Sequence, residues 1–280
     1  MSVPVVSIIT ATFNSSLSIE SCIKSVLSQS YGAVQHIIID GGSTDGTVDI
    51  IRSLTDSTNT FILSERDDGI YDALNKGILL ATGQIIGFLH SDDVFASHDS
   101  IESVVKGFTG PNVSKLRLSR IGPNEDLMSA NHECNSFSVD GVYGDLVYLH
   151  PKSDQLPPLR YWQSQDFTKS LLWRGWMPPH PTLFLLKSVY DNVGNFNKSY
   201  QISADYDFIL RVFSDDSRKF VYIPRVVVKM MPGGASNKSI KNICIKTRED
   251  YTILVSNNFG IFRSFLIVLK KNLSKVKQFL

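Results

Sequence analysis

The first ninety-five residues alternate between short apolar runs and amphipathic segments, and this alternation restricts the chain to few folds. Short apolar runs predict buried strands, whereas apolar residues spaced three and four apart predict helices with one buried face. The predicted strands are 5–12, 34–39, 60–63 and 85–89, and the predicted helices between them are 19–31, 47–54 and 70–81. Such a repeat is typical of an α/β fold with a mostly parallel sheet and flanking helices.

Two carboxylates, Asp92 and Asp93, directly follow the apolar run 85–89. Ligands of open α/β sheets bind at the carboxyl ends of the strands, where we expect these side chains to avoid burial. Mg²⁺ and similar cations take oxygen ligands, usually one or two carboxylates together with phosphate oxygens of a substrate. The pair therefore predicts a cation site, with the alternative that it only forms a turn or caps the next helix.

A glycine-rich turn, 40–46, ends the second predicted strand and begins with Asp40. Right-handed crossovers bring the ends of the second and fourth strands to one edge of the sheet, and the glycines allow the backbone to approach a ligand closely. The alternative is a turn in which Asp40 only caps the helix that follows. No GxGxxG follows the first strand and no GxxxxGK[ST] occurs, so neither a dinucleotide fold nor a P-loop is supported.

Charge and cysteine content exclude several classes of protein. The net charge of +1 gives no indication of a nucleic-acid partner, although residues 236–280 alone carry +7 and the first 235 carry −6. Three scattered cysteines without a CxxC pair argue against disulfides and a zinc site, and are typical of a reducing cytosol. The chain starts without a charged signal-peptide region and has no apolar run near the roughly 20 residues that span a bilayer. We expect a cytoplasmic protein, soluble or peripheral at the membrane.

The segment 261–280 predicts a basic amphipathic helix. Its apolar positions are Phe262, Phe265, Leu266, Leu269, Leu273, Val276 and Leu280, and its basic positions are Arg263, Lys270, Lys271, Lys275 and Lys277. This pattern is typical of a helix that lies on an anionic membrane surface. The alternative is a terminal helix that docks on the protein core.

Seven segments, taken in their order along the chain, resemble the family 2 glycosyltransferases of the GT-A fold. They are TATFN (10–14), IIIDGGSTDGT (37–47), DGIYDALNKGI (68–78), ATGQIIGFLHSDD (81–93), YGD (143–145), PHPTLF (179–184) and ADYDFILRVF (204–213). The chain is most similar to bacterial members that build polysaccharides and lipopolysaccharide O-chains. The resemblance covers about residues 3–235. It implies a transferase domain over 1–235, with a nucleotide-sugar half (1–100) and an acceptor half (101–235), followed by the helical tail 236–280.

The resemblance implies roles for residues of the nucleotide-sugar half. Asp40 would hydrogen-bond the nucleotide base, typically uracil, which would pack against the backbone of Thr10 and Ala11. Asp92 would hold the ribose or share the metal, and Asp93 would bind the Mg²⁺ or Mn²⁺ that clamps the diphosphate. Such a cation stabilises the negative charge that grows on the leaving nucleoside diphosphate.

In the acceptor half, a predicted helix near 203–213 has Asp205 and Asp207 in its first turn, where both could serve only as caps. The resemblance implies that Asp205 is the general base, which takes the proton of the acceptor hydroxyl during direct, inverting attack on the anomeric carbon. Asp207 is its rival. His180 matches a histidine near the diphosphate or metal, and Trp176 could line a sugar site. A structural histidine and core packing are the alternatives for these two residues.

The chain departs from the family pattern at three places. Related sequences often read Glu-Pro-Asp-Lys-Gly where this chain has 65–69 (ERDDG), so Arg66 would have to supply the positive charge toward the diphosphate. His90 stands where asparagine or aspartate is commoner, and we expect it to be tolerated. Residues 111–140 have little apolar periodicity and look like an insertion.

The predicted function is therefore inverting, metal-dependent transfer of a sugar from a nucleotide-sugar, with a preference for UDP, to a hydroxyl of a growing glycan or a lipid-linked acceptor. One alternative is a sugar-nucleotide pyrophosphorylase, but that class needs a basic glycine-rich loop, and residues 10–16 contain no Lys, Arg or Gly. Another is an inactive nucleotide-sugar binding module. Such a module would be expected to lack one of Asp40, Asp93 and Asp205, and all three are present.

Overall fold

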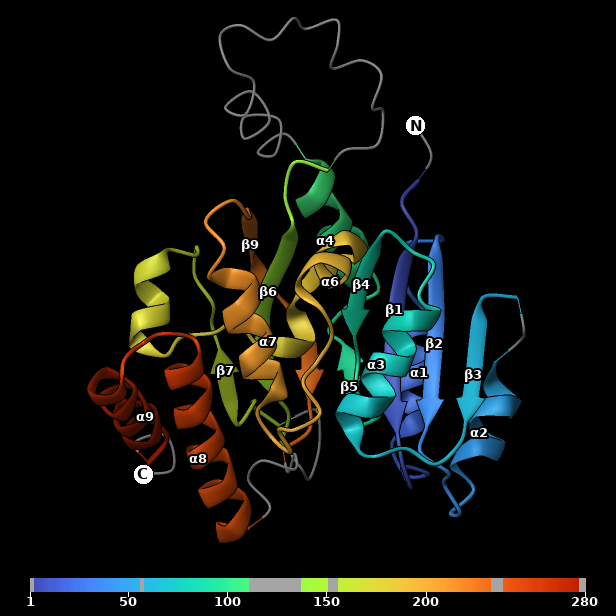
Figure 1. Cartoon of the computed structure of the whole chain (residues 1–280). Coiled ribbons are helices and arrows are strands. Elements are labelled where there is room, and N and C mark those ends of the chain that lie inside the picture. The colour runs from blue at the N-terminus through green and yellow to red at the C-terminus, as the bar shows by residue number, and fades with distance from the viewer. Residues whose placement is uncertain (1–2, 56–57, 111–136, 151–155, 233–238, 277–280) are drawn as a thin grey trace, which may run out of the picture.

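The computed structural model describes residues 3–55, 58–110, 137–150, 156–232 and 239–276, and within them a nine-stranded sheet carries helices on both faces (Figure 1). The elements in chain order are β1 (Val6–Thr12), α1 (Ile19–Leu27), β2 (Val34–Asp40), α2 (Thr47–Leu54), β3 (Thr60–Ser64), α3 (Ile70–Leu80), β4 (Ile85–Phe88), β5 (Asp93–Phe95), α4 (Ser100–Thr109), β6 (Gly141–Tyr148), β7 (Arg160–Trp162), β8 (Phe184–Leu186), α6 (Lys187–Val193), α7 (Ala204–Phe213), β9 (Phe220–Met230), α8 (Ile240–Ser256) and α9 (Ile261–Val276), with short 3-10 helices at Lys169–Arg174 and His180–Thr182.

The strands follow the order β3-β2-β1-β4-β8-β6-β9-β5, and β7 pairs with β6 outside this path. The first four strands of the chain are parallel, as the alternation predicted, and Thr12 of β1 lies beside Asp40 of β2. In the second half β6 and β9 are parallel, whereas β8, β5 and β7 pair antiparallel with their neighbours. The predicted α/β fold is confirmed, and the carboxyl ends of β1, β2 and β4 share one edge.

All seven residues of β1 are buried because helices cover the sheet on both sides. Successive side chains of a strand point to opposite faces, so Ile8 packs in the cluster beside α1 and α4 while Ile9 packs in the cluster beside α3 and α7. Helix α3 lies very close to β1. A Cβ at Gly77 of that helix would lie 2.4 Å from Cγ2 of Ile9, so only glycine fits at this contact.

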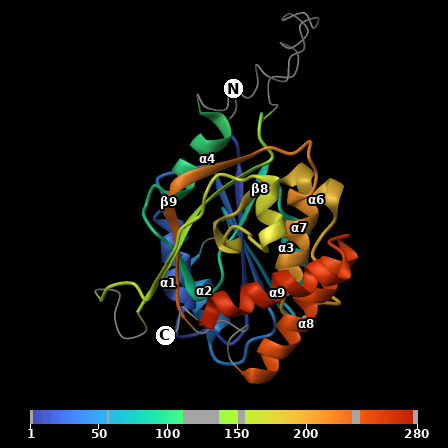
Figure 2. The ribbon, with the colours of Figure 1, turned by 90° about the vertical axis from the view of Figure 1, so that its left-hand side faces the viewer.

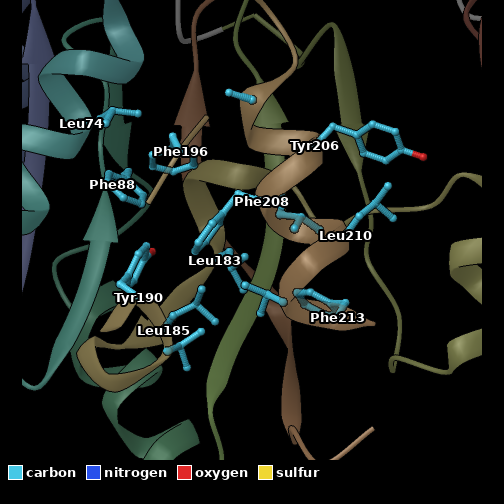
Figure 3. Close-up of a cluster of buried hydrophobic side chains, with 14 of the residues drawn as sticks. Leu74, Phe88, Leu183, Leu185, Tyr190, Phe196, Tyr206, Phe208, Leu210 and Phe213 are labelled. Atoms are coloured by element: carbon cyan, nitrogen blue, oxygen red, sulfur yellow. The ribbon is translucent and has the colours of Figure 1, made fainter. Parts of the chain in front are cut away.

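Aromatic rings fill the larger cluster and connect β4 to α7 (Figure 3). Phe196 stands between them, with ring centroids 5.5 Å from Phe88 of β4 and 4.9 Å from Phe208 of α7, and Tyr190 stacks on Phe208 at 5.0 Å. Buried aromatic side chains contribute much of the energy of a core. This packing fixes α7, which carries Asp205, against the strand that leads to residues 90–93.

The residues after β4 differ from the prediction. Asp93 begins β5, which pairs antiparallel with β9 and sets Asp93 beside Met230. As a result Asp93 is 0 % exposed, whereas Asp92 is half-buried. The expectation that both carboxylates avoid burial is therefore wrong for Asp93.

Helices α8 and α9 form a hairpin that packs on the domain (Figure 2). Ile253 and Leu254 of α8 and Ile267 and Val268 of α9 are buried in the same cluster as α7, so this face of the tail docks on the core. Part of the predicted amphipathic stripe, the side chains from 273 onward, lies outside the described residues, as do positions 111–136 of the predicted insertion. Among the described residues, no helix is both long and apolar enough to cross a membrane.

Candidate functional site

Two carboxylates and two imidazoles gather where β4 ends. Asp92 and His90 come from the loop after β4, His180 from a 3-10 turn, and Asp205 from the first turn of α7. The two imidazole centroids are 6.1 Å apart, the charge of Asp205 acts on both rings, and Asp92 acts on His90. The structure thus brings together three predicted site residues, and it adds His90, which the sequence had suggested only as a tolerated departure.

Asp205 is half-buried and has one carboxylate oxygen held in place. Its Oδ1 accepts hydrogen bonds from the backbone N–H of Tyr206 at 2.8 Å and from the hydroxyl of Tyr71 at 3.4 Å. Burial and then the nearby Asp205 carboxylate raise the pKa of Tyr71 well above its usual value, so this phenol remains a donor. Oδ2 takes no hydrogen bond from the described residues, and it is therefore available to accept a proton.

The sequence did not single out Tyr71, although it lies within the segment 68–78 that carried part of the resemblance. Its hydroxyl also donates to the backbone oxygen of Ile202 at 2.6 Å, so α3 is bonded directly to the turn that precedes α7.

The same turn is capped from the opposite side by Glu249 of α8. Its carboxylate accepts the backbone N–H groups of Gln201 at 2.7 Å, Ile202 at 3.0 Å and Ser203 at 2.9 Å. No local pattern could have indicated this contact, because Glu249 is far from α7 in the sequence. The turn before Asp205 is therefore fixed by α3 and by α8.

Asp207 has a structural role. It is 6 % exposed, and its Oδ2 accepts a hydrogen bond from Nε of Arg211 at 2.9 Å. The guanidinium of Arg211 also donates to the backbone oxygens of Val193 and Asn195, which ties α7 to the segment after α6. This geometry disfavours Asp207 as the rival of Asp205, because its carboxylate forms a part-buried ion pair with Arg211.

The two histidines are neutral at neutral pH because His180 is buried and His90, which is half-buried, has little contact with water around its ring. Burial lowers the pKa of His180 to about 4, and it also lowers the pKa of His90 despite the opposing charges of Asp92 and Asp205. His180 stacks on Phe88 at 5.1 Å, and neither of its ring nitrogens has a hydrogen-bond partner in the described structure. A neutral imidazole has one nitrogen that can accept a hydrogen bond or bind a metal ion. Buried polar atoms usually have a partner, and a bound substrate or cation would supply one here.

Asp93, to which the resemblance assigned the metal, is a buried carboxyl group. Both carboxylate oxygens are buried without a hydrogen-bond partner among the described residues, and burial, followed by the charge of Asp92, raises the pKa well above its usual value. Because metal binding requires the deprotonated form, this shift opposes binding of a cation by Asp93. The geometry favours Asp92 as the carboxylate that faces a ligand.

The groups near β4 that could bind Mg²⁺ or Mn²⁺ are a carboxylate and two neutral imidazoles. No group of three or more His, Cys, Asp or Glu side chains that could hold a metal occurs in the part of the chain that the structure describes. However, Mg²⁺ is commonly held by one or two carboxylates together with substrate phosphates. Asp92 with a neutral imidazole of His90 or His180 fits a cation that is held jointly with a nucleotide.

On the nucleotide side, the carboxylate of Asp40 is committed to its own turn. It is 0 % exposed and accepts hydrogen bonds from Gly42 N at 3.1 Å, Ser43 N at 3.0 Å and Ser64 Oγ at 2.7 Å, as well as from Ser43 Oγ. Gly42 supports this turn with a φ of 85°. The turn alternative therefore describes this side chain, but Asp40 does not cap a helix, because α2 begins after Gly46 without a side-chain cap. Since the carboxylate is fully buried, a hydrogen bond to a base would require the turn to open.

Thr10 and Ala11 are also buried, and the hydroxyl of Thr10 is 3.0 Å from Nε2 of His36. Only their backbone is suited to the predicted contact with a base. The side chains that are exposed next along the chain are Phe13 and Asn14.

Arg66 is exposed, and its backbone lies beside the glycine turn. A Cβ at Gly42 would lie 3.7 Å from the backbone nitrogen of Arg66. Its guanidinium forms no ion pair with the described residues, so it is able to bind an anion at this edge. Trp176, in contrast, is half-buried, and its ring lies 5.9 Å from Tyr143, 6.0 Å from Phe167 and 6.3 Å from Phe213. These contacts favour the packing role for Trp176.

A family model and a relative of known name both match this chain over most or much of its length. The family model described as glycosyl transferase family 2 matches residues 7–154, which is more than half of the chain. A PGL/p-HBAD biosynthesis glycosyltransferase of Mycobacterium tuberculosis is 28 % identical over 279 residues, which cover 99 % of this chain and 93 % of the relative.

Solved structures with the same fold include TarS 1–349 of S. aureus in complex with UDP-GlcNAc (TM-score 0.62, 14 % identity, 94 % of this chain and 70 % of that chain). Another is the mannosyltransferase PcManGT of Pyrobaculum calidifontis in complex with GDP-Man and Mn²⁺ (TM-score 0.61, 15 % identity, 96 % of this chain and 69 % of that chain). The chain spans 39 % of a longer TarS structure. At these identities the structural likeness shows the fold alone.

Proposed function

Because the chain belongs to glycosyl transferase family 2 and is a glycosyltransferase, we propose that it moves a sugar from a nucleoside-diphosphate sugar to an acceptor hydroxyl with inversion. The observation that carries this proposal is the position of Asp205. Asp205 lies in the group formed with Asp92, His90 and His180, at the edge where β1, β2 and β4 end, and its Oδ2 accepts no hydrogen bond from the residues that the structure describes.

The donor half of the site is built for a diphosphate. Asp92 and a neutral imidazole of His90 or His180 would hold Mg²⁺ or Mn²⁺, which supplies positive charge to the leaving nucleoside diphosphate. Arg66 would add a second positive charge from the neighbouring turn. Two structural neighbours, PcManGT in complex with GDP-Man and Mn²⁺ and TarS in complex with UDP-GlcNAc, support a metal and a nucleotide-sugar donor. We retain UDP as the preferred nucleotide.

The acceptor half centres on Asp205. Tyr71 and the N–H of Tyr206 hold Oδ1, which leaves Oδ2 to take the proton of the acceptor hydroxyl. As the proton transfers, the acceptor oxygen forms its bond to the anomeric carbon and the bond to the diphosphate breaks on the opposite side. A single displacement of this kind inverts the configuration of the anomeric carbon.

The proposed acceptor is a growing glycan or a lipid-linked glycan in the synthesis of a bacterial surface polysaccharide, at the cytoplasmic face of the membrane. The relative from PGL/p-HBAD biosynthesis supports this acceptor class. Among the alternatives, the Oδ2 of Asp205, which has no donor in the described part of the chain, favours an active enzyme over an inactive binding module.

The test is a screen of UDP-sugars and GDP-sugars for release of the nucleoside diphosphate by the full-length protein, with Mn²⁺ and with EDTA. We expect metal-dependent turnover with at least one UDP-sugar, and NMR of the product should show the inverted anomer. Release that is unaffected by EDTA would contradict the metal role, and a retained anomer would contradict direct displacement.

A further inference from the structure

Helix α9 has two apolar faces where the sequence suggested one stripe. Ser264, Ile267 and Val268 are at most 6 % exposed and pack on the core. A second set of apolar side chains points outward, with exposures of 45–75 %: Ile261, Phe262, Phe265, Leu266 and Leu269. At about 100° per residue these five positions share one side of the helix. The docked helix therefore presents a continuous apolar surface.

Helix α8 extends this surface, which we call the hairpin outer face. Ile243 of α8 is 48 % exposed and borders a groove of about 480 Å³ between the helices. Tyr251, Phe265 and Leu269 also line this groove, and its lining is mainly apolar.

The charges around the hairpin outer face all have the same sign. The exposed charged residues described on α8 and α9 are Lys241, Arg248, Arg263 and Lys270. The acidic residues of the described hairpin face inward, because Glu249 caps the turn before α7 and Asp250 pairs with Lys246 at 3.3 Å and Lys271 at 2.9 Å.

We infer that the hairpin outer face docks on an anionic lipid bilayer. Exposed phenylalanine and leucine side chains flanked by lysine and arginine match the boundary between acyl chains and anionic headgroups. A second copy of the chain fits less well, since a two-fold interface made by this face would bring like charges together.

The position of the hairpin adds to this inference, which goes beyond the proposed transfer reaction. Helices α8 and α9 lie at the outside of the molecule in both views, and Figure 1 shows them toward the end to which β1, β2 and β4 point. Docking would therefore bring the end of the molecule that carries Asp205 close to the membrane surface.

The test is flotation of the full-length protein with phosphatidylcholine vesicles, with and without phosphatidylglycerol. We expect binding only with phosphatidylglycerol. Phe262→Ser combined with Phe265→Ser should lower the partition coefficient roughly 100-fold, because transfer of each phenyl group is worth about tenfold. Leu17→Ser combined with Leu79→Ser, at exposed positions elsewhere, is the matched control and should bind as wild type.

Two double variants, each of which replaces two basic residues by glutamate, test the electrostatic contribution to membrane binding. Arg248→Glu with Lys270→Glu should abolish binding, and high salt should weaken binding of the wild type. Lys24→Glu with Lys106→Glu makes the same change in net charge on other exposed helices and should retain binding.

Three outcomes would overturn the inference: no binding to anionic vesicles, equal loss in the matched controls, or a dimer in sedimentation that the phenylalanine variant dissociates. Circular dichroism and the melting temperature establish that each variant is folded. Because flotation needs no donor or acceptor, failure of this inference is distinguishable from failure of the proposed transferase reaction.

Discussion

Glu249 should be required for both stability and turnover, although it lies outside the group around Asp205. Glu249→Ala removes the acceptor of three backbone N–H groups, at 2.7, 3.0 and 2.9 Å. A hydrogen bond to a charged group contributes about 1.5–3 kcal/mol, but the N–H of exposed Gln201 can return to water. The loss of the two part-buried bonds should therefore lower the free energy of unfolding by about 3–6 kcal/mol.

Urea unfolding and steady-state kinetics, both well below the melting temperature, measure the two effects. Fraying of the turn before α7 should misplace Asp205 and lower kcat between about tenfold and 100-fold, while KM for the donor stays near wild type. Glu249→Gln retains an acceptor oxygen and should recover part of both losses. Glu20→Ala, which removes an exposed helical glutamate paired with Lys24, is the control and should change stability by less than about 1 kcal/mol.

If Glu249→Ala unfolds at the same urea concentration as wild type, Glu249 does not stabilise the turn before α7. A variant that loses stability but keeps the wild-type kcat would show that Glu249 caps the turn without positioning Asp205.

Two further predictions concern Asp92 and His36. Asp92→Asn should weaken binding of a nucleoside diphosphate with Mn²⁺ by about 30-fold or more in calorimetric titration, since losing one partner of a charge contact costs at least about 2 kcal/mol. Asp93→Asn should leave this affinity within about threefold of wild type, and equal losses in both variants would contradict the assignment to Asp92. Burial lowers the pKa of His36 from 6.5 to about 4, so the native state keeps it neutral while the unfolded chain binds a proton. The stability that the neutral His36 provides is complete above pH 6.5 and is lost as the pH falls toward 4. Between pH 7 and pH 5 the free energy of unfolding should fall by about 2 kcal/mol because of this residue. Urea unfolding of His36→Gln should show a difference in the free energy of unfolding between pH 7 and pH 5 that is about 2 kcal/mol smaller than that of wild type. The same difference in both proteins would contradict this role of His36.

The first half of the fold was predictable because each element carries its own pattern. The apolar spacing of 47–54 predicted α2 with its observed bounds, and the runs at 5–12 and 34–39 predicted β1 and β2 to within one residue. Strand β5 was not predictable in the same way. It has three residues and begins with an aspartate, and it exists because β9, far along the chain, pairs with it.

The residues of the site also divide into those that a local motif indicates and those that depend on contacts between distant elements. Asp92, His180 and Asp205 occur in short motifs, and the structure places them together. The hydrogen bonds of Tyr71 and Glu249 to the turn before α7 depend on tertiary packing between distant elements, which no local pattern encodes. The burial of Asp93 depends on tertiary packing in the same way.

The role of Asp205 as the base is tested most directly by kcat of Asp205→Asn. We expect a loss of roughly 10²–10⁴-fold in kcat, with the melting temperature and donor affinity near wild type. Asp207→Asn is the comparison, and it should mainly lower stability, because it breaks the part-buried ion pair with Arg211. A near-normal kcat for Asp205→Asn, or a larger loss of kcat in folded Asp207→Asn, would contradict the account.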